Sequence, residues 1–146
     1  YRVYYRKQGI FECKLYDGIK ELLEHLHNEG KKVILATSKP EEFAVQLLEH
    51  FDIIKYFDVV AGSTMDGSRV EKADVIRYAM SRIKEFDVND AVMIGDRKFD
   101  YIGSKECGIP CILIGYGYGE MEELENCKPF AIKESVFELQ KFLDSI

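Results

Sequence analysis

Residues 31–40 read KKVILATSKP, and this stretch decides the fold class. Two lysines are followed by a continuous apolar run, which is typical of a strand that is buried on both faces of a parallel sheet. The run ends in two hydroxyl residues, Thr37 and Ser38, and Pro40 then occupies a position that favours the first turn of a helix. The stretch therefore predicts a buried strand, a short polar turn and the start of a helix.

The same alternation of strand and helix extends along the rest of the chain. Strands separated by helices of this length form βαβ units, in which the strands are parallel. The predicted fold class is therefore α/β, with a doubly wound, mostly parallel, Rossmann-like sheet. We predict helices over 18–29, 40–50, 71–85, 98–107, about 119–126 and 135–144, and strands over 31–37, 57–61, 91–94, 111–114 and near 130–132.

Composition narrows the classes of function. The chain has 146 residues, of which 47% are apolar, and this suits one folded domain with a core. A net charge of −6 argues against a broad nucleic-acid surface, which needs clustered lysine and arginine. No apolar run approaches the roughly 20 residues that cross a bilayer. The four cysteines and three histidines show no zinc-binding spacing. We expect reduced thiols in a cytoplasmic protein without nucleic-acid or membrane partners.

Polar residues follow the predicted strands at the edge where such sheets bind ligands. Thr37 and Ser38 end the first strand. Hydroxyl groups there, beside the free N–H groups of a helix start, can bind an oxyanion, although plain helix capping would also explain them. Lys72 stands at the start of a helix, where a cation is unfavourable against the helix dipole. Lys72 must therefore face either solvent or an anion.

Residues 95–100, GDRKFD, carry the sharpest signal. Asp96 comes just after a predicted strand, and Asp100 lies four residues later, so both side chains can face the same crevice. Two carboxylates suit Mg²⁺, which usually takes one or two protein carboxylates together with waters and substrate phosphate. The alternative is that Asp96 only caps the helix and Asp100 only complements its dipole.

Taken together, these features occur in a fixed order, each at its own strand end. The segments LATSKPEEFA (35–44), FDVVAGSTMDGSRVEKADVI (57–76), VMIGDRKFD (92–100) and GYGYGE (115–120) resemble the haloacid dehalogenase-like (HAD-like) hydrolases, in the phosphoglycolate phosphatase-like branch. The resemblance extends over essentially the whole chain. It implies a HAD-like core and a Mg²⁺ cofactor.

The resemblance also implies a role for each of these residues. Thr37 matches the hydroxyl that binds the transferred phosphoryl group, and Ser38 supplies backbone N–H groups beside it. Lys72 matches the lysine that neutralises charge on the nucleophile and the phosphate. Asp96 matches the Mg²⁺ ligand, and Asp100 matches its companion, as a second ligand or as an acceptor behind it. Family members that cleave carbon–halogen bonds lack this acidic pair, so the resemblance favours phosphoryl transfer.

The first motif of the family, a DxDGT-type segment on the central strand, does not occur in this sequence. Its first Asp is the nucleophile and its second is the general acid and base. The similar stretches at 16–18 and 65–67 follow no apolar strand and are interpreted as turns. We expect further N-terminal residues to supply this central strand and most of a helical cap. Residues 1–16 would then be the end of the cap and a hinge, and 17–146 the core.

The predicted function is a Mg²⁺-dependent phosphomonoester hydrolase for a small phosphorylated metabolite, acting through an aspartyl-phosphate intermediate. The 146 residues alone are predicted to be inactive, because the attacking aspartate is not among them. One alternative is a 5′-nucleotidase or a sugar-phosphate phosphatase or mutase of the same superfamily. The other is a non-catalytic regulatory module that binds phosphate or Mg²⁺.

Overall fold

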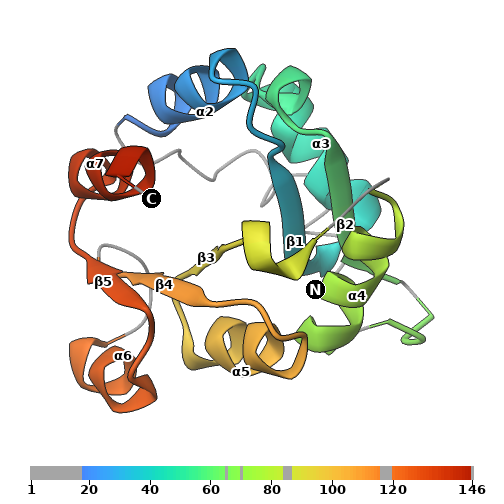
Figure 1. Cartoon of the computed structure of the whole chain (residues 1–146). Helices are drawn as coiled ribbons and strands as arrows, with labels where there is room; N and C mark the ends of the chain where they lie inside the picture. The colour runs from blue at the N-terminus through green and yellow to red at the C-terminus, as the bar shows by residue number, and fades with distance from the viewer. Residues whose placement is uncertain (1–17, 65, 70, 84–86, 116–119, 146) are drawn as a thin grey trace.

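The computed structural model describes residues 18–64, 66–69, 71–83, 87–115 and 120–145. The predicted cap end and hinge at 1–16 lie outside these residues, as does most of the segment 115–120. No helix in the described part is long and apolar enough to cross a membrane. The helices and strands alternate as predicted (Figure 1): α2 (Ile19–Asn28), β1 (Ile34–Pro40), α3 (Glu41–His50), η2 (Ile54–Tyr56), β2 (Val59–Ser63), α4 (Lys72–Ser81), η3 (Val88–Asp90), β3 (Met93–Gly95), α5 (Lys98–Glu106), β4 (Cys111–Ile114), α6 (Met121–Cys127), β5 (Ala131–Lys133) and α7 (Val136–Ser145).

Helices cover both faces of the strands, as Figure 1 shows, with α2, α3 and α7 on one side and α4, α5 and α6 on the other. The strand β4 explains the arrangement, because its successive side chains point to opposite faces. Cys111 and Leu113 pack against Leu124 of α6. Ile112 and Ile114 belong to a second cluster with residues of α2 and α7. The predicted doubly wound α/β fold is confirmed.

The strands form two separate parallel sheets within the described residues. One contains β1 and β2, and the other has the order β3-β4-β5. The strand β4 is buried along its whole length, whereas β1 and β3 contain no fully buried residue, and Ile94 of β3 is 36% exposed. The middle strands of a continuous sheet are normally the most buried. The sequence was predicted to lack the central strand of the sheet. In the described residues, the position of that strand corresponds to the gap between β1 and β3.

Two predicted elements have boundaries that differ from the structure by more than two residues. The first strand was expected at 31–37 but spans Ile34–Pro40, because Pro40 pairs with Ser63 beyond an irregularity that follows Ala36. Thr37 and Ser38 therefore belong to the irregular end of β1 and not to a turn after it. The helix expected at 71–85 ends at Ser81.

Candidate active site

A buried ion pair between Lys72 and Asp100 lies at the centre of the candidate site. Lys72 Nζ is 2.8 Å from Asp100 Oδ1, and the two side chains are only 13% and 9% exposed. Lys72 Nζ also donates to the carbonyl oxygen of Ala36, at 3.2 Å. Of the two outcomes expected for Lys72 from its place at the start of a helix, solvent or an anion, the structure therefore shows the anion. The contacts of Lys72 also connect β1 to α5.

The second oxygen of Asp100 binds the start of α5. Asp100 Oδ2 accepts the backbone N–H groups of Asp96 at 3.0 Å and of Arg97 at 3.2 Å. Asp100 is thus the residue that caps the helix, a role that the alternative interpretation had given to Asp96. Both carboxylate oxygens of Asp100 have partners within the protein. Asp96 is half-buried at the end of β3 and is hydrogen-bonded through its backbone to Asp100.

Two glycines allow these side chains to approach one another. A Cβ atom at Gly95 would overlap the carboxylate of Asp100. A Cβ atom at Gly103 of α5 would lie 2.8 Å from Cγ of Lys72, closer than real Cβ contacts allow. The sequence analysis did not assign either glycine to the site, although Gly95 stands directly before the predicted metal ligand. The ion pair therefore depends on two positions that tolerate no side chain.

The hydroxyl residues lie beside the ion pair. Thr37 Oγ1 accepts the backbone N–H of Lys39 at 3.2 Å, and Ser38 is exposed. Ser38 and Lys72 both line a cavity of about 390 Å³ between α4 and α5. Direct contacts join Lys72, Asp100 and the backbone of Asp96. Ser38 lines the same cavity as Lys72, and Thr37 follows Ala36, whose carbonyl oxygen Lys72 binds.

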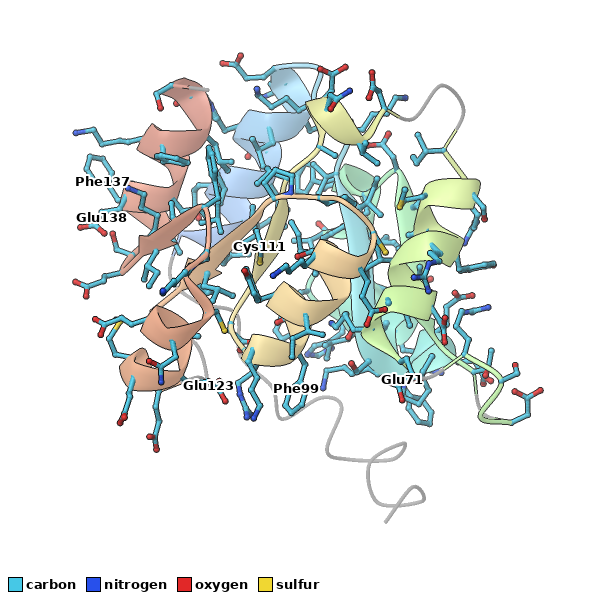
Figure 2. The ribbon with its side chains drawn as sticks, turned by 60° about the horizontal axis from the view of Figure 1, so that its bottom comes forward. Glu71, Phe99, Cys111, Glu123, Phe137 and Glu138 are labelled. Atoms are coloured by element: carbon cyan, nitrogen blue, oxygen red, sulfur yellow. The ribbon has the colours of Figure 1, made fainter. Side chains whose placement is uncertain are left out.

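An ion pair that the sequence did not predict flanks the site. Arg97 Nε and Nη2 donate to the two carboxylate oxygens of Glu123, at 2.9 and 3.2 Å. The hydrogen bond from Arg97 lowers the pKa of Glu123, and the same bond raises the pKa of Arg97. In Figure 2, Glu123, Phe99 and Glu71 follow one edge of the molecule, from α6 across α5 to α4. The Arg97–Glu123 ion pair therefore holds α6 next to the segment that contains Asp96.

A second polar cluster lies between α2 and α7. His25 Nε2 is 2.9 Å from Asp144 Oδ1 and 3.7 Å from Glu29 Oε1. These three are the only His, Cys or acidic side chains of the described residues that gather closely enough to share a metal ion. Glu29 and Asp144 are exposed. The sequence analysis did not foresee this group, because Asp144 is 119 residues away from His25.

Comparisons with known proteins identify the family of the chain. The family model described as "Haloacid dehalogenase-like hydrolase" matches residues 1–114. The chain belongs to the haloacid dehalogenase-like hydrolase family. The resemblance seen in the sequence is thereby confirmed for residues that include Thr37, Lys72 and Asp96. The match does not assign a role to any single residue.

Solved structures and curated relatives cover almost the whole chain. The crystal structure of a predicted phosphatase from Clostridium acetobutylicum has a TM-score of 0.96 and 45% identity, and the match covers 99% of this chain and 67% of that one. A 5′-nucleotidase from Pseudomonas aeruginosa is 36% identical over 145 residues, which are 99% of this chain and 65% of the relative.

Two further relatives carry other names. Tyrosine-protein kinase PtkA from Mycobacterium tuberculosis is 38% identical over 126 residues, which are 86% of this chain and 43% of the kinase. A phosphoglycolate phosphatase from Vibrio parahaemolyticus is 29% identical over 136 residues, which are 93% of this chain and 59% of the phosphatase. The chain thus spans between 43% and 65% of the length of these curated relatives.

Proposed function

We propose that the complete protein is a Mg²⁺-dependent phosphomonoester hydrolase for a small phosphorylated metabolite, of the phosphoglycolate phosphatase-like type. The buried pair of Lys72 and Asp100 carries the proposal, because it holds a cation at the strand ends, near the hydroxyl residues that end β1 and a second carboxylate. A phosphate monoester requires positive charge and hydrogen-bond donors around its oxygens. Membership of the haloacid dehalogenase-like hydrolases and the phosphatases among the relatives support the same reaction.

The chain's own residues would bind the phosphoryl group. Thr37 would donate its hydroxyl, and the backbone N–H groups at Ser38 would add hydrogen bonds. Lys72 would neutralise charge on the phosphate and on the attacking carboxylate. Its ammonium group is held by Asp100 and by a backbone carbonyl, so its position is set before substrate arrives. Such preorganisation lowers the barrier because little reorganisation remains for the reaction step.

The acidic pair fits Mg²⁺, with different tasks for its two members. Asp96 places a carboxylate at the end of β3, and carboxylate oxygens are the protein ligands that Mg²⁺ prefers. Asp100 already uses one oxygen for Lys72 and the other for two backbone N–H groups. We therefore assign Asp96 as the ligand and Asp100 as the acceptor that orients the Asp96 segment. When bound, Mg²⁺ would polarise the phosphoryl oxygens and offset their charge.

The attacking aspartate would come from a strand outside the described residues. Among the residues that the structure describes, both β1 and β3 have a neighbouring strand on one side only, and both are less buried than β4. A parallel strand inserted between them would pair their free N–H and C=O groups, each of which costs about 1–3 kcal/mol when buried without a partner. It would also place its end beside Thr37 and Asp96. An aspartate there could attack phosphorus and displace the alcohol of the ester, which forms an aspartyl-phosphate. Water would then hydrolyse this intermediate, releasing inorganic phosphate and restoring the carboxylate.

The test uses the complete protein, a panel of phosphate esters and the variant Asp96→Asn. We expect release of inorganic phosphate that requires Mg²⁺, and loss of that Mg²⁺-dependent activity in Asp96→Asn. Asp90→Asn, a change at an exposed residue of η3, is the matched control and should keep wild-type activity. Full activity of Asp96→Asn would refute the metal role. Phosphate binding without hydrolysis would favour the non-catalytic module.

The substrate panel also separates the enzyme alternatives. A 5′-nucleotide substrate has specific support, because a 5′-nucleotidase is 36% identical over 145 residues. Phosphoglycolate is supported by the phosphatase from Vibrio parahaemolyticus. Comparing kcat/KM for phosphoglycolate, a nucleoside 5′-monophosphate and a hexose phosphate identifies the preferred leaving group. We place the reaction in the cytoplasm, where thiols such as Cys111 remain reduced.

A further inference from the structure

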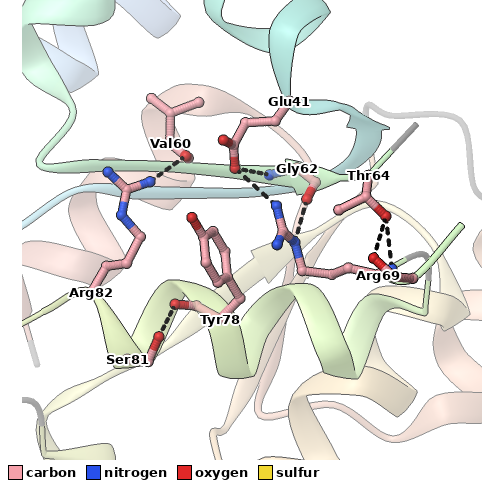
Figure 3. A network of polar contacts seen from close by, with 9 residues as sticks. Glu41, Val60, Gly62, Thr64, Arg69, Tyr78, Ser81 and Arg82 are labelled. Atoms are coloured by element: carbon pink, nitrogen blue, oxygen red, sulfur yellow. Dashed lines mark hydrogen bonds and ion pairs between the residues drawn. The ribbon is translucent and has the colours of Figure 1, made fainter. Parts of the chain in front are cut away.

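The turn after β2 is closed by contacts between Thr64 and Arg69 (Figure 3). The N–H of Thr64 donates to the Arg69 carbonyl at 2.9 Å, and the N–H of Arg69 donates to Thr64 Oγ1 at 2.9 Å. Inside the turn, Ser68 N–H donates to Asp66 at 3.0 Å. This bond and the hydroxyls of Ser68 and Thr64 lower the pKa of Asp66 to about 2. The contacts place Arg69 at the end of the turn, three residues before Lys72.

The side chain of Arg69 joins this turn to β2 and to the start of α3. Its Nε donates to the carbonyl of Gly62 at 2.9 Å, and its Nη2 donates to Glu41 Oε1 at 3.2 Å. The same oxygen of Glu41 accepts the N–H of Gly62 at 3.2 Å. The guanidinium also lies over the ring of Tyr78 in α4, with Cζ 3.7 Å from the ring centroid. Figure 3 shows these contacts, which we call the Glu41–Arg69 clamp.

The clamp connects the two segments that would bind phosphate. Glu41 is the first residue of α3 and lies three residues after Ser38, whereas Arg69 lies three residues before Lys72. Gly62 of β2 packs against the first of these segments, because a Cβ atom there would lie 2.6 Å from both the Cα of Glu41 and the carbonyl oxygen of Lys39. Since Arg69 binds both Gly62 and Glu41, a change in the clamp would alter the spacing between the hydroxyl residues at the end of β1 and Lys72.

The clamp differs from the ordinary surface ion pairs of this chain. Lys55–Asp52 and Arg77–Asp74 each join residues three apart, and all four side chains are at least 50% exposed. The clamp joins residues 28 apart, with side chains 20% and 33% exposed. Only a planar guanidinium can donate to a carbonyl and a carboxylate and also stack on an aromatic ring. Arg69 makes all three contacts, which a lysine could not.

We propose that Glu41 and Arg69 are positioning residues that hold Thr37 and Ser38, at the end of β1, and Lys72 at the separation a phosphoryl group requires. The proposal rests on the phosphatase function proposed above. Neither clamp residue touches the substrate; each acts through the groups beside it. A displacement of about 1 Å in such groups lowers the rate of an enzyme by as much as about 100-fold.

The test measures hydrolysis of p-nitrophenyl phosphate by the complete protein, well below its melting temperature. Arg69→Lys keeps the positive charge but loses the planar set of guanidinium N–H donors, and Glu41→Gln removes the negative charge of the carboxylate that accepts from Arg69. We expect each to lower kcat by about 10- to 100-fold. KM should change much less, because the displaced groups act on the transition state. The Mg²⁺ concentration for half-maximal activity should stay the same, because Asp96 follows β3, whereas Glu41 begins α3 and Arg69 precedes α4.

Matched variants separate positioning from general stability. Arg77→Lys, at an exposed ion pair on the helix α4 that follows Arg69, should leave kcat unchanged. The double variant Glu41→Gln/Arg69→Lys should be no slower than the slower single variant, because both changes break one clamp. Wild-type kcat in both single variants, even with a lowered melting temperature, would overturn the clamp and leave the phosphatase function standing. A complete wild-type protein that hydrolyses no phosphate ester would overturn both.

Discussion

Replacing Asp100 by asparagine tests the buried ion pair on which the candidate site depends. Lys72 Nζ and Asp100 Oδ1 are 2.8 Å apart, and the side chains are 13% and 9% exposed. Asparagine has nearly the same shape and keeps a carbonyl oxygen for the N–H groups of Asp96 and Arg97. The change removes the negative charge and leaves the ammonium group without a counterion.

The expected cost follows from this isolated charge. Removing one partner of a buried ion pair costs about 3–5 kcal/mol, because the other charge stays buried without compensation. Asparagine can still accept the backbone N–H groups at the start of α5, and Lys72 can still donate to the carbonyl oxygen of Ala36. We therefore expect the lower end of the range, about 3 kcal/mol. In a domain of about 150–250 residues this loss lowers the melting temperature by about 6–12 °C.

The assay is urea unfolding of the complete protein, followed by circular dichroism. Asp74→Asn is the matched control, because Asp74 pairs with Arg77 at 3.2 Å with both side chains about half exposed. Such exposed pairs contribute about 0–1 kcal/mol. A free energy of unfolding for Asp100→Asn within about 1 kcal/mol of wild type, or equal to that of the control, would show that the pair does not hold the site together.

Three further predictions concern packing and thiol chemistry. Gly103→Ala should displace Lys72, whose Cγ would lie 2.8 Å from the new methyl group, and should lower both activity and the free energy of unfolding, the latter by about 1–3 kcal/mol; Lys105→Ala, an exposed change on the same helix, is the control for both measurements. Leu124→Ala should cost about 2–5 kcal/mol in urea unfolding, because Leu124 is fully buried. Burial raises the pKa of Cys111 to about 11, so iodoacetamide at pH 8 should modify the half-buried Cys107 before the buried Cys111. Equal labelling rates of these two thiols, resolved by mass spectrometry, would contradict this. The stability that the neutral Cys111 thiol adds should be lost as the pH rises from 9 through about 11.

Local sequence patterns were sufficient for most of the architecture. The run CILI predicted β4 at Cys111–Ile114, and the structure has the same bounds, because a strand covered on both faces requires consecutive apolar residues. The first strand was misplaced because its end depends on the pairing of Pro40 with Ser63. That pairing joins segments 23 positions apart and leaves no local periodic signal.

The candidate site was predicted in its members but not in its contacts. The helix dipole indicated that Lys72 must face solvent or an anion, and the structure identifies Asp100 as that anion. The two residues meet because α4 packs against α5 at Gly103, where the lysine stem passes. No local property of the sequence places one helix against the other at that glycine.

The sequence by itself determined the order of strands and helices and which polar residues follow each strand, since apolar periodicity and the free N–H groups of helix starts are local properties. Only the tertiary structure decided that Asp100 binds Lys72 and the start of α5, that Arg69 holds Glu41, and that, within the described part of the chain, β1 and β3 each have one unpaired edge. The physical reason is that buried charges and backbone groups must find partners, and those partners lie far apart in the chain and meet only when the elements pack.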